Sequence, residues 1–429
     1  MQSATAIAGL CLSATVALAA LHGLTPLVPK LAIGLPAWAA GILLWRRANA
    51  RTRSQALVLA GIGLAAMAAA TLRDGRIDIV LAVAGNGQLI AMLAAVSFLR
   101  LVARPDPAGA PAHPQGRGAL WSTLLGVHLF GAVINLSVVF IMADRLHANG
   151  GLNPRQVGVL TRGFSAAAFW SPFFAAMAAA LSYAPGAHFS QLLLMGVPLA
   201  ALALTVTALD RPAAADAGFT GYPMRYGTLW LPVSLAVLVL TLHSLFPGWP
   251  VLAIICLLAP TIALVHTLGV GARGSGPLGE HVRHGLPGMA NELLLFLAAG
   301  LMAAGIGALF GTLNGWLPFS RFSGLEASLT LAFMYLVSLA GVHPVIGIAV
   351  LGTLLAPLDP APDLLAMTFL CAWGTSVGTS PFSGMSLALQ GRYGLRPLDF
   401  LRWNGRYSLV MLVCSCAVLT AYSHWVLRL

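Results

Sequence analysis

The sequence has little charge for its length. Only 8% of its 429 residues are charged, with 12 acidic residues and one lysine, Lys30, among 23 basic residues. Soluble domains carry about 25% charged residues, so this composition excludes an ordinary soluble enzyme or binding protein. In place of charge the chain has 59% hydrophobic residues and a mean hydropathy of +0.87.

The hydrophobic residues gather in repeated runs, several of which reach the roughly 20 residues that a helix needs to cross a bilayer. We therefore predict an all-α polytopic membrane protein with about 11 transmembrane helices. The predicted spans are Ala4–Leu21, Leu27–Trp45, Gln55–Leu72, Asp78–Val102, Leu120–Ala143, Gln191–Leu209, Thr228–Leu245, Pro250–Thr267, Gly288–Phe310, Ala327–Leu355 and Tyr407–Leu427. The predicted connectors are Pro105–Gly118, Arg211–Gly227 and Gly269–Gly285.

The sequence contains no pattern typical of a metal site, a nucleic-acid-binding surface or a nucleotide-binding loop. All five cysteines lie in apolar runs, and no spacing resembles a metal knuckle or a disulfide framework. The net charge of +11 comes from arginines scattered through short connections rather than gathered on one face, so we predict no nucleic-acid partner. No glycine-rich nucleotide loop is present, so direct coupling to ATP is not expected.

Two further apolar segments, Pro154–Ser182 and Asp363–Gln390, are interrupted in the middle. If both enter and leave on one side as re-entrant hairpins, the main arginine clusters all fall in the cytoplasm, as the positive-inside bias requires. These clusters are Arg46, Arg47, Arg51 and Arg53; Arg100, Arg104 and Arg117; Arg211 and Arg225; Arg273 and Arg283; and Arg392, Arg396, Arg402 and Arg406. We predict a bacterial inner (plasma) membrane location, with the N-terminus cytoplasmic and the C-terminus outside.

The two interrupted segments share a tripeptide. Ser171-Pro172-Phe173 and Ser380-Pro381-Phe382 stand 209 residues apart, and the same offset pairs the flanking spans in opposite orientations. An inverted-topology repeat of this kind is typical of secondary transporters. The predicted organisation is therefore N-terminal scaffold helices (residues 1–54), a first repeat (55–210), a connecting region (211–285) and a second repeat (286–429).

Each Ser-Pro pair is predicted to begin a short helix inside the membrane, because serine favours the N-cap and proline the first helical position. Irregular backbone at this depth is tolerated inside protein or beside a watery cavity, which indicates a binding site. The predicted substrate-binding residues are Ser380, Pro381, Ser383, Thr379, Ser171, Pro172, Asn135 and His343. The predicted cation-binding residues are Gly374, Thr375, Ser376 and Gly378. The alternative is a proline-kinked membrane helix whose serines bond to their own helix.

Other polar residues at membrane depth are few. Glu292 is the candidate proton-coupling residue, and the alternative is an interfacial carboxylate paired with Arg283 or with a helix N-terminus. Asn135 lies midway along its predicted span, and the repeat offset places it beside His343-Pro344, where a Gly-x-His-Pro sequence indicates an unwound helix. We expect Asn135 and His343 to line breaks that face the two hairpins.

The second hairpin, "GTSVGTSPFSGMSLALQGRYG", and the segment "GLPGMANELLLFLAAGLMAAGI" resemble the ion transporter superfamily of citrate symporters, sodium-dicarboxylate symporters, sodium-proton antiporters and TRAP membrane subunits. The Ser-Pro-hydrophobic-Ser element is similar to the re-entrant tip of citrate symporters. The resemblance implies a homodimer in which the hairpin domain moves as an elevator. The Ser-Asn-Thr signature of the dicarboxylate branch is absent, which puts a symmetric pair of sodium sites in doubt.

The predicted function is secondary active transport of a small organic anion, a carboxylate by preference, coupled to protons or sodium. The expected partners are the small-molecule anion and membrane lipids, and no cofactor is predicted unless a sodium ion is the coupling ion. The alternatives are a cation/proton antiporter without an organic substrate, and a membrane-embedded enzyme or subunit of lipid or polysaccharide assembly. The leading prediction is a protein that is not an enzyme.

Overall fold

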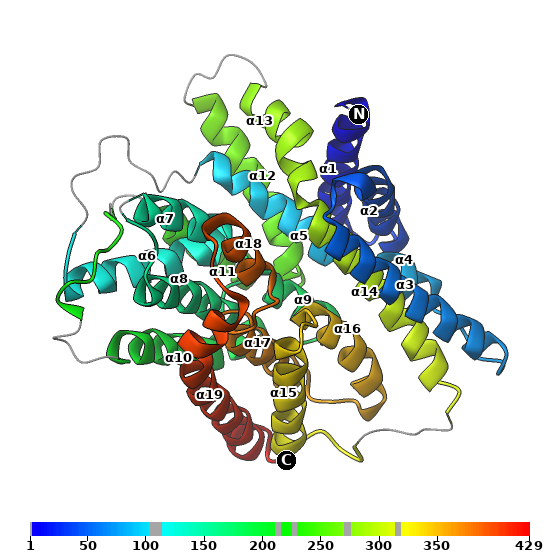
Figure 1. Cartoon of the computed structure of the whole chain (residues 1–429). Helices are drawn as coiled ribbons and strands as arrows, with labels where there is room; N and C mark the ends of the chain where they lie inside the picture. Colours follow the sequence, from blue (N-terminus) through cyan, green and yellow to red (C-terminus); the bar gives the residue numbers. More distant parts are fainter. Residues whose placement is uncertain are drawn as a thin grey trace. The chain divides into compact units, whose positions relative to one another are not determined.

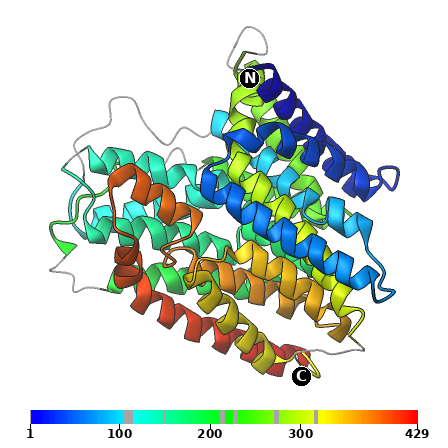
Figure 2. The ribbon, with the colours of Figure 1, turned by 45° about the vertical axis from the view of Figure 1, so that its right-hand side comes forward.

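The computed structural model describes residues 2–102, 114–148, 150–210, 216–224, 230–269, 276–313 and 319–429, without the side chains of residues 2, 231 and 232. Within these ranges the chain is helical, and the only strand-like feature is an isolated β-bridge between Gln115 and Thr220 (Figures 1 and 2). Among the described residues, eight helices are long and apolar enough to cross a membrane, and three shorter apolar helices accompany them. The prediction of an all-α polytopic membrane protein is confirmed.

The chain divides into two compact units, which are described separately. Unit 1 comprises Met1–Ala103, Ala236–Ser320 and Ile348–Asp359. Its helices are α1 (Gln2–Leu24), α2 (Lys30–Leu44), α3 (Ala50–Thr71), α4 (Ile79–Ala84), α5 (Gly87–Ser97), α12 (Val251–Gly269), α13 (Gly276–Glu280) and α14 (Ala290–Phe310).

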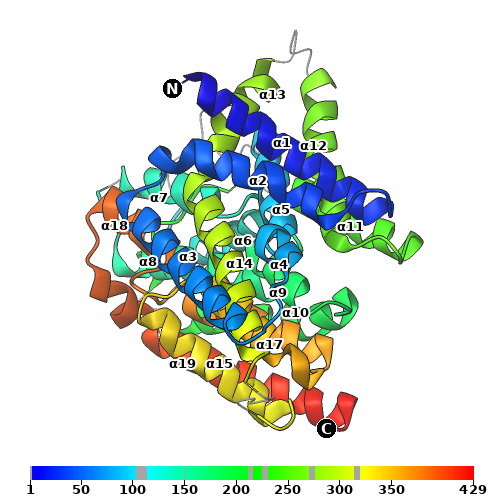
Figure 3. The ribbon, with the colours of Figure 1, turned by 90° about the vertical axis from the view of Figure 1, so that its right-hand side faces the viewer.

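Helix α3 lies along α14 (Figures 1 and 3). A Cβ atom added to Gly305 would lie 2.1 Å from the carbonyl oxygen of Gly63, so only glycine fits at this contact. Small residues let membrane helices approach closely, where lipid supplies no hydrophobic driving force between them.

Unit 2 comprises Arg104–Leu235, Arg321–Gly347 and Pro360–Leu429, and it contains both interrupted segments. Its helices are α6 (Arg117–Ile134), α7 (Ser137–His147), α8 (Pro154–Ala166), α9 (Ala175–Tyr183), α10 (Phe189–Leu209), α15 (Gly324–Leu339), α17 (Pro362–Ser376), α18 (Gly384–Tyr393) and α19 (Pro397–Ala421). Two more helices, α11 (Trp230–Leu245) and α16 (Pro344–Leu355), have residues in both units.

The order of helices in the first half recurs in the second half. Helix α18 begins 209 residues after α9, and α17 and α19 each begin 208 residues after α8 and α10. Helices α15 and α16 each begin 207 residues after α6 and α7. Five helix starts therefore repeat at nearly one interval, which extends the repeat well beyond the shared Ser-Pro-Phe tripeptide.

Three predicted spans are not continuous helices. Leu120–Ala143 is divided at Asn135, and Ala327–Leu355 is divided between Leu339 and Pro344, so the two expected breaks are present. Asp78–Val102 is also divided, at Gly85 and Asn86, which the sequence did not indicate.

The prediction of a connector at Gly269–Gly285 is wrong for residues 276–285, which are helical. Helix α13 continues through a π turn at His281–Gly285 and a 3-10 turn at Leu286–Met289 into α14. The Gly-Leu-Pro-Gly sequence changes the helical pitch there without ending the helix, because proline keeps a helical φ and needs no N–H donor in such a turn. Several predicted connector residues, namely Arg104, Pro105 to His113, Arg211, Arg225 and Arg273, lie outside the described residues.

Candidate functional site

The second hairpin consists of α17, an irregular linker at 377–383, and α18. The Ser380 hydroxyl donates to the carbonyl oxygen of Ser338 on α15 (2.6 Å) and accepts from the N–H of Phe382 (3.3 Å). Ser380 is therefore anchored to a neighbouring helix within unit 2.

The prediction that Ser380-Pro381 begins the second helix of the hairpin is wrong. Helix α18 begins at Gly384, and its N-cap is Ser383, whose hydroxyl accepts from the N–H of Ser386 (3.1 Å) and donates to the Ser386 hydroxyl (3.0 Å). Ser383 caps α18, whereas the hydroxyl of Ser380 donates its hydrogen bond to the Ser338 carbonyl on α15.

Helices α15 and α16 are separated by a break that faces this hairpin. Gly341 has φ +110°, and a Cβ there would lie 3.3 Å from the Phe382 ring, so glycine meets both a conformational and a spatial need. His343 precedes α16, which begins with Pro344, and its Nδ1 accepts from the N–H of Val345 (3.3 Å). The His343 ring also meets Trp373 edge-on at 5.1 Å.

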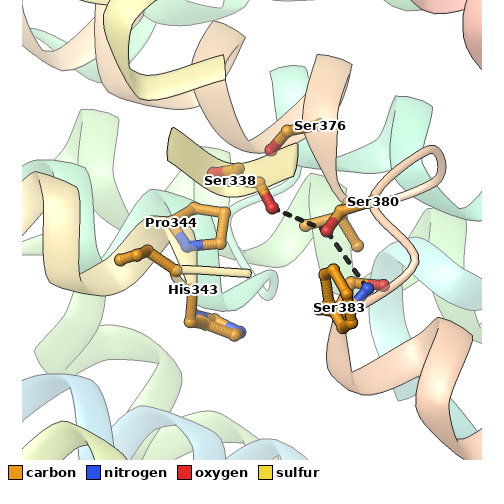
Figure 4. A pocket seen from close by; sticks show the side chains of 9 residues that line it. Ser338, His343, Pro344, Ser376, Ser380 and Ser383 are labelled. Atoms are coloured by element: carbon orange, nitrogen blue, oxygen red, sulfur yellow. Dashed lines mark hydrogen bonds between the residues drawn. The ribbon is translucent and has the colours of Figure 1, made fainter. Parts of the chain in front are cut away.

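A small pocket, with room for about one water molecule, lies between the hairpin linker and the α15–α16 break. Figure 4 shows His343 and Pro344 on one side and Ser380 and Ser383 on the other. The labelled lining residues are Ser338, His343, Pro344, Ser376, Ser380 and Ser383. The lining supplies hydroxyls and one imidazole, and no carboxylate, lysine or arginine.

Four helix ends meet around this pocket. Helices α15 and α17 end beside it, and α16 and α18 begin beside it. The N-terminal end of a helix carries a partial positive charge, and the C-terminal end a partial negative charge. The pocket therefore offers backbone dipoles of both signs without a formally charged side chain.

The first hairpin repeats the same contact. The Ser171 hydroxyl donates to the carbonyl oxygen of Ala132 near the end of α6 (2.5 Å) and accepts from the N–H of Phe173 (3.2 Å). Asn135 stands at the α6–α7 break with φ +55°, and its side chain donates to the carbonyl oxygen of Phe173 (3.2 Å). Asn135 and Gly341 thus both adopt positive φ and both contact the phenylalanine that follows Ser-Pro.

The prediction that Ser171-Pro172 begins a helix is also wrong, because α9 begins at Ala175. Its N-cap, Phe174, supplies no side-chain hydrogen bond. As in the second hairpin, the serine hydroxyl bonds to a broken helix instead of capping its own.

The predicted cation ligands have protein partners. The hydroxyls of Thr375 and Ser376 donate to carbonyls one turn earlier in α17 (2.7 and 2.6 Å). The carbonyl oxygen of Gly378 accepts from Asn404 (2.7 Å), and Gly374 packs against the Phe169 ring. The hydroxyl oxygens keep lone pairs, so cation binding here stays a prediction.

Thr379 is fully buried beside these groups. Within the described part of the chain its hydroxyl has no hydrogen-bond partner. Such a group is rare in protein interiors and is an open position for a water or ligand.

A buried arginine network escaped prediction from the sequence. Arg162 on α8 is 4% exposed; its Nε donates to Asn404 (2.8 Å) and one Nη to Asp210 (2.9 Å). Asn404 on α19 in turn donates to the Gly378 carbonyl in the second hairpin. The network joins the first hairpin to the break of the second, and the only sequence signal for it was a charge within an apolar hairpin.

The end of α18 is held to α7 by a second polar cluster. Asp144 accepts from Arg392 (2.6 and 2.7 Å) and from the Tyr393 hydroxyl (2.7 Å). Burial and the neighbouring carboxylate raise the pKa of the Tyr393 hydroxyl. This cluster fixes the far end of the second hairpin.

Glu292 belongs to unit 1, away in the chain from the pocket residues. It lies in the first turn of α14 with an exposed side chain, and the adjacent Asn291 accepts from the N–H of Asn49 (3.0 Å). Asn86, at the α4–α5 break, donates to the carbonyl of Phe296 (2.7 Å). Proton coupling by Glu292 stays a prediction.

Comparison with models of known protein families and with curated proteins finds no match. Among solved structures, the chain is similar to the crystal structure of the YdaH transporter of Alcanivorax borkumensis, with 15% identity and a TM-score of 0.46. The alignment covers 86% of this chain and 83% of that one. A likeness at this level carries no argument about function, which therefore depends on the site.

Proposed function

We propose that the protein is a secondary active transporter of a small organic anion, a carboxylate by preference. The observation that carries this proposal is the meeting of two interrupted hairpins with two broken helices in one unit, each through the same serine-to-carbonyl bond. Breaks of this kind at membrane depth are features of transporter binding sites. The repeat would have inverted topology, with both hairpins re-entrant.

The chemistry of the pocket supports an anion. The starts of α16 and α18 and the hydroxyls of Ser380 and Ser383 would bind a carboxylate without a countercharge. The ends of α15 and α17 would favour a cation at the same place. Binding of both together is the physical basis of coupled transport, with the cation a proton or sodium.

Substrate would cross by an elevator-type movement. Both hairpins and most of the broken helices belong to unit 2, which would move as one body while unit 1 serves as scaffold. We further propose a homodimer in a bacterial inner membrane, with the N-terminus cytoplasmic and the C-terminus outside. The resemblance to the ion transporter superfamily points the same way.

A cation/proton antiporter is the second candidate, because a pocket of hydroxyls and helix C-terminal ends also suits a cation alone. Counterflow in proteoliposomes distinguishes the two. An organic anion carrier exchanges labelled for unlabelled carboxylate in the absence of any gradient, and an antiporter does not. A membrane-embedded enzyme of lipid or polysaccharide assembly would show neither activity.

The site is tested by the double substitution Ser380→Ala with Pro381→Ala, which should abolish carboxylate uptake and leave expression unchanged. The matched control is Ser182→Ala in the first hairpin, whose hydroxyl donates only within its own helix (2.7 Å). Normal flux in a well-expressed double variant contradicts the assignment of the site.

A further inference from the structure

His128 lies in the middle of α6 and contacts both helix α8 and the break of the first hairpin. Its Nδ1 is 3.0 Å from the carbonyl oxygen of Gly163 on α8, and its Nε2 is 3.1 Å from the indole Nε1 of Trp170. The side chain is 5% exposed, and Trp170 is the residue directly before Ser171. No role in the predicted site involves this histidine.

The partners of the two ring nitrogens fix the protonation of the ring. An indole N–H can only donate, so Nε2 of His128 must be the acceptor, and a carbonyl can only accept, so Nδ1 must carry the proton. The Gly163 carbonyl can accept the Nδ1–H of His128 because the N–H four residues later, that of Ala167, bonds to the carbonyls of Phe164 and Ser165 instead. The geometry therefore requires a neutral histidine.

We propose that His128 is a proton-binding group of the transporter and that its protonation releases Trp170 and the break of the first hairpin. A proton added at Nε2 would face the indole N–H, so the bond between them would be replaced by a clash of two donors. The ring would keep its bond to Gly163, so the change would be confined to the Trp170 side. This inference rests on the proposed function, and it names the proton as the coupling ion.

The charged groups on the helices around α6 are engaged elsewhere. On α8, Arg162 bonds to Asp210 and Asn404, and Arg155 pairs with Asp216 (2.9 Å). On α7, Asp144 pairs with Arg392 and His147 stacks on Tyr393. The other charged residue of α7 is Arg145, which lies near the C-terminal end of that helix. The described part of α10, like the turn at Ala167–Phe169, carries no charged residue before Asp210. Burial and Trp170 are thus the main features that hold His128 neutral.

Proton access is provided on the Trp170 side. Trp170 is half-buried, whereas its neighbours Phe169 and Ser171 are fully buried. Movement of the indole would open a path to Nε2 and would at the same time loosen the linker that holds Ser171. Proton binding and the position of the hairpin break are coupled through a single hydrogen bond.

The test that needs no substrate is hydrogen exchange of the full chain in detergent between pH 8 and pH 3.5, corrected for the intrinsic rate. We expect protection of residues 167–174 to fall by about two- to tenfold as the pH is lowered, since one hydrogen bond contributes about 0.5–1.5 kcal/mol. His128→Gln can accept from Trp170 but cannot take up a proton, so its protection should not change with pH.

Two further variants separate the proposal from a folding effect. Trp170→Phe removes the indole donor and keeps the histidine, so the protection of residues 167–174 should be low at both ends of the pH range and should no longer change with pH. His243→Gln is the matched control, because the His243 ring bonds a backbone carbonyl (3.1 Å) in another part of the chain, and it should behave as the natural protein. Protection that is independent of pH in the natural protein overturns the proposal.

Transport supplies the second readout. In proteoliposomes, His128→Gln should retain counterflow and lose accumulation driven by a pH gradient. If Glu292→Gln loses gradient-driven accumulation and His128→Gln keeps it, His128 is not the coupling group. Absence of any carboxylate flux in the natural protein refutes the proposed function, and hydrogen exchange then decides on His128 alone.

Discussion

Replacing the tip serines one at a time, as Ser171→Ala and Ser380→Ala, tests whether each hairpin is anchored to a broken helix. Each hydroxyl takes part in two hydrogen bonds, one to a carbonyl of the broken helix and one from the N–H two residues later. Ser171 is fully buried, so water cannot replace its lost bonds, whereas Ser380 lines the pocket, where a water molecule can replace part of them.

The structure predicts unequal costs for the two substitutions. The Ser338 carbonyl also accepts from the N–H of Gly341 (3.1 Å), so it keeps a partner when Ser380 is removed. The Ala132 carbonyl has no described backbone N–H bonded to it. An unsatisfied buried group costs about 1–3 kcal/mol, so we expect about 2–3 kcal/mol for Ser171→Ala and about 1–2 kcal/mol for Ser380→Ala.

The assay is equilibrium unfolding in mixed detergent micelles, followed by circular dichroism. Ser182→Ala is the reference, because its hydroxyl bonds to a carbonyl one turn earlier in α9, and such bonds add little to helix stability. We expect a change of about 0.5 kcal/mol or less for this control. If both tip variants unfold at the same detergent composition as the control, the hairpins are not anchored as described.

Two other substitutions have definite expected outcomes. Asn404→Ala should lower the free energy of unfolding by about 3 kcal/mol or more, because the buried Arg162 and the Gly378 carbonyl both lose a partner. Val413→Ala, at a position 68% exposed on the same helix, should change it little, and equal effects would contradict the network. Gly341→Ala should cost about 1–3 kcal/mol through its φ of +110° and the Phe382 ring. Gly391→Ala, with open space around it, should cost nothing; similar unfolding curves for the two would show that the break is not strained.

The sequence was sufficient to predict where the helices of the two halves are interrupted. A helix is interrupted at each Ser-Pro-Phe tripeptide and at the Gly-x-His-Pro sequence, because proline and glycine disfavour a continuous helix. The offset of 209 residues relates the interruptions of one half to those of the other. The breaks at Asn135 and before Pro344 follow from the same local chemistry. Helix interruptions that depend on the φ of glycine or on the missing N–H of proline were therefore predictable. So were the membrane-spanning helices, which depend on the length of an apolar run.

Features decided by a distant partner were not predictable. A free Ser-Pro pair would cap a helix, but the hydroxyl of Ser380 bonds to Ser338, which lies 42 residues earlier. Arg162 finds its amide partner Asn404 242 residues away, and no local pattern shows that the two meet. In a membrane the choice among such partners is strict, since each polar group must be satisfied inside the protein.

The repeated anchoring bond also bears on how a substrate could be released. If a hairpin opened by itself, its serine would leave a carbonyl of α6 or α15, and in the second hairpin the Asn404 bond to Gly378 would break as well. Each loss would cost about 1–3 kcal/mol in surroundings where lipid offers no replacement. Movement of unit 2 as one body keeps all of these bonds. The bonding pattern therefore favours the elevator-type movement over opening of a single hairpin.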